Sequence, residues 1–365
     1  MPRLARLFSD PAPRDTFSRP QAPSASLPSP QAQLLSPLRW LITAVSLLAT
    51  FGVSAWVIIS NWPADGAPLG LPIWGHLLCL GAFGLDLLFR FIKIHFSARA
   101  IGVPVSFSAI VRTSLGGDFA AAITPSRSGA EPARFLIMSE SGVPVAGVVI
   151  VLFLELFLEA MSLFVVTVTL GLVLRDSSGL VRGLLGTVTV YSAGVVGAGI
   201  FGLTLSKRSA RGRRPQWVTR LGINAMIWHR VQRALRQLRG SIDSLRTAHR
   251  GLLALALGFS VLHVCARLLT LPIIVWTYGG DVAPGPLLLW PMVLLYGAAV
   301  APAPGGGGMV EVAFKVALGG TLPARLLAAS LIWWRFYTFY LYLVAGALAS
   351  GRTVLRALRR AKRHQ

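Results

Sequence analysis

The sequence predicts an all-α, polytopic membrane protein with about six transmembrane helices and two re-entrant helical hairpins, arranged as an inverted-topology repeat. Of its 365 residues, 54% are hydrophobic and only 13% are charged, which is too apolar for a soluble domain of this length. Two short apolar stretches broken by glycine and proline, Asp118–Arg134 and Pro302–Lys315, occupy matching places in the two halves. Paired interruptions of this kind are typical of transporter sites at the bilayer midplane.

Six apolar runs have the length that a membrane span requires, about 20 residues for a hydrocarbon core of ~30 Å. A Pro/Ser-rich tail over 1–37 precedes the first run and is expected to be disordered and cytoplasmic. The transmembrane domain is predicted over 38–350 and a basic cytoplasmic tail over 351–365. The predicted spans are 38–60, 71–92, 144–173, 184–205, 251–277 and 325–349.

The formal net charge of +22 is concentrated beside the spans, so membrane topology explains it better than nucleic-acid binding. By the positive-inside rule, the four basic stretches are cytoplasmic, and both termini are expected to face the cytoplasm. These stretches are Arg3–Arg39, Arg90–Arg112, the twelve Lys and Arg residues from Lys207 to Arg250, and Arg352–Arg363.

An internal repeat relates residues 71–173 to residues 251–349. A gapless register pairs Arg90 with Arg267, and it continues through the two broken stretches with three inserted residues in the second half. The ordered series, rather than any single pair, indicates a repeat. Its pairs are Leu80 and Leu257, Gly81 and Gly258, Leu85 and Leu262, Arg90 and Arg267, Gly102 and Gly279, Pro125 and Pro304, Gly129 and Gly308, Glu131 and Glu311, and Glu155 and Arg335.

Each broken stretch must enter and leave on one side of the membrane to satisfy the predicted orientations of its neighbours. We therefore interpret both as re-entrant hairpins with tips at 124–132 and 301–308. Non-helical backbone at membrane depth must be buried in protein or line a wet cavity, so the tips are expected to meet near the centre. Ordinary loops with an extra pair of tilted spans are the alternative.

Charged residues at membrane depth need a partner or a function, because each costs about 2.5–3.5 kcal/mol at a helix centre. Glu155 and Glu159 are four residues apart and share one helix face. They must face Arg or Lys or hold a proton. Arg335, with the opposite sign at the repeat-related position, is the expected counter-charge.

The second tip leads into a helix that is predicted to begin near Met309, so free N–H groups of the glycine run would favour a phosphate or carboxylate. Arg127 and Arg134 offer rigid forks to the same oxygens, although a simple pair with Glu131 is the alternative. The candidate head-group and cavity residues are Arg127, Glu131, Arg134, Glu155, Glu159, Gly305, Gly306, Gly307, Gly308, Glu311, Lys315 and Arg335, with Asp118, Arg90 and Arg267 as secondary candidates.

The loop 206–250 predicts a basic amphipathic helix that lies on the anionic cytoplasmic leaflet, with a coiled-coil or docking helix as the alternative. Cys79 and Cys265 lie within apolar spans and imply neither a disulfide nor a metal site. The histidines of the spans are scattered. No metal, cofactor or Walker A motif is indicated.

Three motifs resemble the lysylphosphatidylglycerol synthase transmembrane region, a flippase-like family of bacterial integral membrane proteins. Pro-Ser-Arg-Ser-Gly-Ala-Glu-Pro-Ala-Arg (125–134) is similar to its P-x-R-x-G-E-x-x-R segment, and Pro-Ala-Pro-Gly-Gly-Gly-Gly-Met-Val-Glu (302–311) to its P-x-P-G-G-x-G-x-x-E. Trp-Arg-Phe-Tyr (334–337) is similar to its tyrosine-arginine region. The chain departs from the family in the extra Ala130, and in Glu155-Leu-Phe-Leu-Glu159, which lacks the usual arginine.

The resemblance implies translocation of a phospholipid or another anionic or zwitterionic lipid between leaflets, without the aminoacyl-transferase domain and hence without lipid synthesis. From the residues, two other classes stay open. One is a membrane enzyme with Glu131 or Asp118 as general base, acting on a polyprenyl lipid or a glycerophospholipid. The other is a scaffold that docks a cytosolic enzyme through 206–250. The expected partners are the lipid substrate, the anionic leaflet and a second copy of the chain.

Overall fold

A computed structural model describes residues 45, 48, 51–56, 58–60, 70–174, 182–183, 186–194, 196–197, 200, 248–297 and 303–351. The predicted tail 1–37, nearly all of the loop 206–250 and all but the first residue of the tail 351–365 lie outside these residues. The spans predicted over 38–60 and 184–205 fall within them only in part.

The regular secondary structure of the described residues is helical, which confirms the all-α prediction. A π-helical turn, η3 (Phe336–Tyr340), interrupts the last helix, which continues to Gly351. The helices are α3 (Ile73–Ala100), α4 (Phe107–Ile123), α5 (Ala130–Glu140), α6 (Val145–Val173), α10 (Arg250–Leu268), α11 (Thr270–Thr277), α12 (Pro284–Gly297), α13 (Met309–Leu318) and α14 (Ala324–Arg335).

Within the described residues, three helical segments are long and apolar enough to cross a membrane: Gly147–Val173, Arg250–Thr277 and Ala324–Gly351. They coincide with the spans predicted over 144–173, 251–277 and 325–349. Helix α3 has 28 residues, which corresponds to about 42 Å. Helix α3 covers the predicted span 71–92. It is more polar than the three apolar segments, because its second half carries several buried charged residues.

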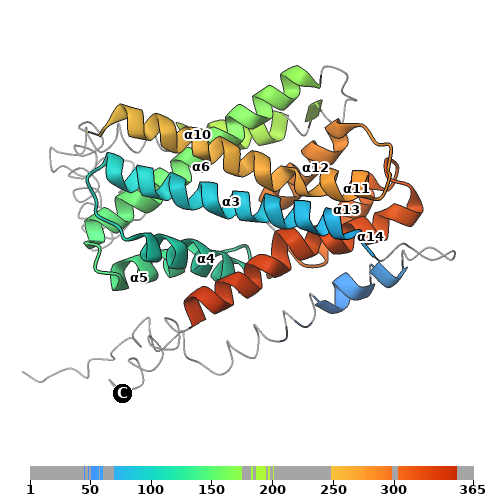
Figure 1. The fold of residues 1–365 in the computed structure, drawn as a ribbon, viewed down its shortest axis with the longest axis horizontal. Helices are drawn as coiled ribbons and strands as arrows, with labels where there is room; N and C mark the ends of the chain where they lie inside the picture. The colour runs from blue at the N-terminus through green and yellow to red at the C-terminus, as the bar shows by residue number, and fades with distance from the viewer. Residues whose placement is uncertain are drawn as a thin grey trace, which may run out of the picture. The chain divides into compact units, whose positions relative to one another are not determined.

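Helices α3 and α10 run antiparallel along most of their length (Figure 1). At one end the His249 N–H donates to the Ala100 carbonyl oxygen over 3.0 Å. At the other end, where α11 follows α10, a Cβ on Gly75 would lie 2.5 Å from Thr277 Cγ2, so glycine permits this close approach. The two halves of the chain therefore meet along one long helix pair.

Two glycines that the repeat register pairs end equivalent helices in the same way. Gly102 follows α3 with a φ of 69°, and Gly279 follows α11 with a φ of 73°. The Gly102 N–H donates to Arg99 O, and the Gly279 N–H donates to Trp276 O, over 3.1 and 2.9 Å. A left-handed residue after a helix favours glycine, since other residues pay about 1–2 kcal/mol there.

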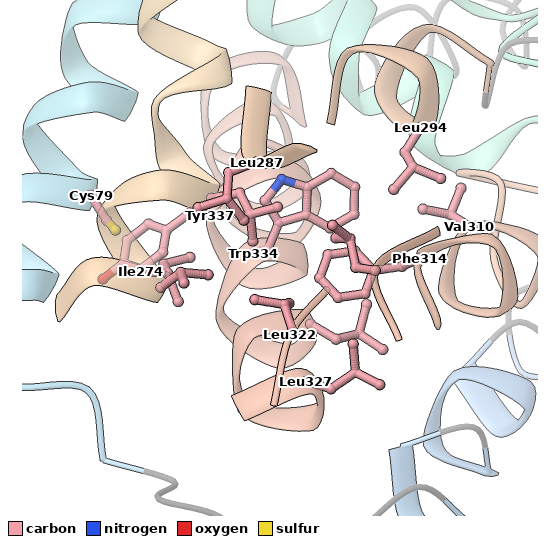
Figure 2. Close-up of a cluster of buried hydrophobic side chains, with 14 of the residues drawn as sticks. Cys79, Ile274, Leu287, Leu294, Val310, Phe314, Leu322, Leu327, Trp334 and Tyr337 are labelled. Carbon is pink, nitrogen blue, oxygen red and sulfur yellow. The ribbon is translucent and has the colours of Figure 1, made fainter. Parts of the chain in front are cut away.

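A hydrophobic core holds α13 against α11, α12 and α14. Figure 2 shows Trp334 near the centre of this cluster with Phe314 beside it. Both side chains are fully buried, and their ring centroids are 5.3 Å apart. Because interiors are close-packed, this contact fixes the position of the second broken stretch, which immediately precedes α13.

Candidate functional site

The two broken stretches meet in the folded chain. Pro125, in the break between α4 and α5, and Pro304, in the break before α13, form an isolated antiparallel bridge. These are the two prolines that the repeat register pairs. The prediction that the tips contact each other is thus confirmed.

The two breaks begin with the same backbone turn, although they differ at their last residue, where Gly129 has a φ of −81° and Gly308 a φ of 76°. Ser126 and Arg127 have φ values of 50° and 55°, and Gly305 and Gly306 have values of 59° and 69°. In each break, the residue after these two left-handed residues donates its N–H to the carbonyl oxygen of the preceding proline. Ser128 donates to Pro125 and Gly307 donates to Pro304, each over 3.1 Å. For the non-glycine residues this left-handed conformation costs about 1–2 kcal/mol each.

The glycine run does not offer four free N–H groups, which corrects the sequence prediction. The Gly306 N–H donates to Ala303 O over 3.0 Å, and the Gly307 N–H is also used within the turn. Gly306, Gly307 and Gly308 are buried, and Gly305 is the member of the run that lines a cavity. Helix α13 begins at Met309, as predicted.

Two adjoining cavities, which we call the two lobes of the site, lie beside the breaks. The larger lobe, of about 250 Å³, is lined mainly by α5, α6, α10, α12 and the first break. The smaller lobe, of about 50 Å³, is lined by Gly305, Arg335 and Phe339 among others. The lobes share four lining residues, and most of the predicted charged candidates surround them. The shared residues are Asp118, Arg127, Leu295 and Arg267.

Two of the shared residues are cations without a carboxylate partner. Within the part of the chain that the structure describes, neither Arg127 nor Arg267 forms an ion pair. The buried Nε of Arg267 has no hydrogen-bond partner there, and its guanidinium lies 5.0 Å from the centroid of the Tyr342 ring. An arginine fork beside a cavity with unused donors suits an anionic group.

Carboxylates line the other wall of the larger lobe. Arg134 Nη1 lies 3.2 Å from Glu155 Oε1 and 3.3 Å from Glu131 Oε1, and its Nη2 lies 3.7 Å from Asp118. Gly117 makes room for this arginine, because a Cβ there would lie 2.4 Å from Arg134 Nε. The second oxygen of Glu155 is buried and has no hydrogen-bond partner among the described residues.

A buried network joins α3 to α6 and α10. Arg90, which is 3% exposed, binds Asp118 and lies 2.9 Å from Asp86. Arg90 is therefore held between two carboxylates inside the protein.

The network continues to a histidine that sequence reasoning did not select. Asp86 also binds His263, whose Nε2 lies 3.1 Å from Glu159 Oε1, and Lys93 Nζ donates to Glu159 over 2.6 Å. The repeat register could have indicated His263, because the offset of 177 residues that pairs Arg90 with Arg267 also pairs Asp86 with His263.

Arg335 is not the counter-charge of Glu155 or Glu159. Its Nε lies 2.8 Å from Glu311 Oε1 in a buried ion pair, and Ser54 Oγ donates to the same oxygen over 2.9 Å. The prediction failed because Glu155 and Arg335 each face their own hairpin, and Glu159 pairs with Lys93 of α3 and His263 of α10. Lys315 is exposed and lines neither lobe.

Both cysteines are free, as expected from their places in apolar helices. Within the described residues no group of three or more His, Cys, Asp or Glu side chains could hold a metal ion.

The fold and the cavity define a helical membrane protein with a charged interior site. The family described as "Lysylphosphatidylglycerol synthase TM region" matches residues 32–346, which is most of the chain. The chain therefore belongs to this family, and it is a membrane protein of a group related to lipid modification or transport. No curated protein matches it.

Proposed function

We propose that this protein moves a phospholipid, or another lipid with an anionic or zwitterionic head group, between the two leaflets of a bilayer. One observation carries the proposal: the cavity where the breaks meet combines two arginines with a carboxylate oxygen, none of which has an ion-pair or hydrogen-bond partner of opposite charge among the described residues. Buried charges are costly in a membrane unless they are paired or functional. The family's relation to lipids supports the same reading.

The charges in the cavity are separated in a way that fits a zwitterionic head group. Arg127 and Arg267, shared by both lobes, would hold the phosphate. Glu155, with its unpartnered oxygen, and Glu131, which is 53% exposed, would accept the hydrogen bonds of an ammonium group. The two sets lie within one cavity, so one head group can occupy both.

We further propose that α4–α5 and α12–α13 are re-entrant hairpins of an inverted repeat. Helices α5 and α13 have 11 and 10 residues, about half the length of a membrane span. The contact between Pro125 and Pro304, and that between Asp86 and His263, join residues that the repeat register pairs. Residues on a two-fold axis meet their own equivalents, so both contacts are what an inverted repeat predicts.

The basic loops favour an orientation with both termini in the cytoplasm, and the family resemblance favours a bacterial cytoplasmic membrane. The loop 206–250 would then lie on the anionic leaflet, and a second copy of the chain is the expected protein partner. In this proposal the protein is a transporter rather than an enzyme. ATP hydrolysis is not its energy source.

The test is a scrambling assay in proteoliposomes that contain the purified protein and a head-group-labelled zwitterionic lipid. A membrane-impermeant quencher reports how much label crosses between leaflets, and mass spectrometry reports whether the lipid is chemically changed. Arg127→Ala, Arg267→Ala and Glu155→Gln should slow the crossing at least tenfold. Lys315→Gln, which alters an exposed residue outside the cavity, is the matched control.

Chemical conversion of the lipid without crossing would replace this proposal with a membrane enzyme. If the lipid neither crossed the bilayer nor was chemically converted, a scaffold role would remain. If the cavity variants moved lipid as fast as the wild-type protein, the site would be wrong even though the activity was present.

A further inference from the structure

His263 lies between two carboxylates. Its Nδ1 contacts Asp86 Oδ1, and its Nε2 lies 3.1 Å from Glu159 Oε1. A hydrogen bond between a ring nitrogen and an ionised carboxylate requires a proton on the nitrogen, because the carboxylate can only accept. A neutral imidazole carries one such proton. Hydrogen bonds from both ring nitrogens therefore require one more proton than a neutral histidine between two ionised carboxylates provides.

The other groups that face this site place the extra proton on the imidazole. Asp86 accepts hydrogen bonds from Arg90 of the same helix α3 and from Tyr342 beyond η3. Glu159 of α6 accepts hydrogen bonds from Lys93 of α3 and from Tyr296 of α12. Both carboxylates are surrounded by donors, which stabilise their ionised forms.

On helix α10 itself, Arg267 is the nearby charged group, and its guanidinium lies over the Tyr342 ring. The site as a whole therefore contains the cations Arg90, Lys93 and Arg267 with the anions Asp86 and Glu159. A charged His263 is tolerated here because both of its nitrogens contact anions, and no cation hydrogen-bonds to its ring among the described residues.

This site is connected to the proposed lipid cavity. His263 is only 2% exposed, but Glu159 is 26% exposed, and both line the larger lobe together with Arg127 and Arg267. A proton can thus pass between the lobe and the imidazole through Glu159. The same site links the two halves of the chain, because Asp86 and Glu159 belong to the first half and His263 to the second.

We infer that the Asp86–His263–Glu159 cluster is a proton-binding site that couples lipid movement to proton movement in the same direction. The inference rests on the proposed function and adds its coupling ion. The bound proton adds a positive charge to the wall of the lobe that holds the phosphate, so the proton and the anionic group favour each other's binding. Loss of the proton removes an ionic link between the two halves.

The transport test uses the full chain in proteoliposomes with a pH difference of one unit and the membrane potential held at zero by potassium and valinomycin. The labelled zwitterionic lipid should accumulate in the leaflet that faces the alkaline compartment. With one proton per lipid, the enrichment approaches about tenfold, because one pH unit is a tenfold ratio of proton activity. His263→Gln and Glu159→Gln should equilibrate the lipid without enrichment.

His95→Gln is the matched control, because His95 is on α3 beside Phe96 and outside the cluster. It should show the same enrichment as the wild-type protein. Glu159→Gln keeps the shape of the side chain, so the test stands even if His263→Gln does not fold.

A second measurement does not depend on transport. Nitrogen NMR of histidine-labelled protein at pH 7, with His263 assigned by its loss in His263→Gln, should show a doubly protonated ring. A neutral ring would overturn the proton site. Lipid that equilibrates in the wild-type protein without responding to pH, or that accumulates on the acidic side, would overturn the coupling alone. Lipid that does not move at all would overturn the proposed function and the coupling with it.

Discussion

The two hairpin breaks share a left-handed turn after their proline but differ in the residues that form it. In the second break glycines occupy both left-handed positions, Gly305 and Gly306. In the first break Ser126 and Arg127 occupy them at a cost of about 1–2 kcal/mol each. The turn itself is therefore a requirement of the fold, whereas the arginine serves another purpose. Its place beside both lobes supports the ligand-binding role that we propose for it.

The ion pairs behind the breaks differ in the same way. In the first half, Glu155 of α6 binds Arg134 of α5 in the wall of the larger lobe. Among the described residues, Glu155 and Glu311 each keep one buried oxygen without a hydrogen-bond partner, but Glu311 lines neither lobe. In the second half, Arg335 of α14 binds Glu311 of α13 away from the larger lobe. Each pair links a long helix to the hairpin of the same half. The carboxylate lies on the long helix in the first half and on the hairpin in the second. The second pair thus holds the fold, and the first also faces the proposed ligand.

The largest expected effect separates these two pairs. Glu311→Gln leaves a buried guanidinium without its carboxylate, and we expect the free energy of unfolding to fall by about 3–5 kcal/mol. Glu155→Gln should cost about 1 kcal/mol, because Arg134 keeps contacts with Glu131 and Asp118. Unfolding by SDS in detergent micelles measures both. Equal losses for the two variants would contradict the comparison.

The second prediction concerns the glycine break. In Gly305→Ala the new Cβ would lie 2.2 Å from the ring of Phe339 in a left-handed conformation, so we expect a loss of about 3 kcal/mol. Gly102→Ala is the matched control, because its φ is also left-handed but nothing lies within 4 Å of the site. It should lose about 1 kcal/mol. A small loss of stability in Gly305→Ala would show that the break can move away from Phe339.

The third prediction separates stability from function at Arg127. Arg127→Gly relieves the left-handed strain, so its unfolding free energy should exceed that of Arg127→Ala by about 1 kcal/mol. Both variants lose a guanidinium whose charged hydrogen bonds are worth about 1.5–3 kcal/mol, so both should move lipid about 10- to 100-fold more slowly. A glycine variant that is stable and fully active would remove Arg127 from the site.

The smallest expected effect is at Lys315, a sequence candidate that the structure leaves exposed. Lys315→Gln should change the unfolding free energy by less than about 0.5 kcal/mol and leave the rate of lipid crossing unchanged. A large change in the crossing rate would mean that Lys315 contacts the lipid from outside the cavity.

Several parts of the site were predictable because they depend on local sequence. The breaks, the start of α13 near Met309 and the left-handed Gly102 and Gly279 follow from glycine, proline and spacing alone. The contact between the tips followed from the need to bury irregular backbone.

The partners of the charges were not predictable in the same way. Arg335 was assigned to Glu155 and Glu159 because its sign and its repeat position fitted. The pairing instead depends on how each helix is rotated, and Arg335 faces Glu311. His263 was passed over because the histidines are far apart in sequence, and only the packing of α3 against α10 brings it to Asp86.

The sequence by itself determined that this is a helical membrane protein, where its helices break, and which charges need partners, because these follow from composition, period and residue geometry. The tertiary structure decided which charge meets which. Within the described part of the chain, it left Arg127 and Arg267 without ion pairs beside a cavity, buried Gly306–Gly308 away from it, and placed His263 between two carboxylates. Ion pairs between helices are fixed by rotation and packing across the whole fold, which no local pattern encodes.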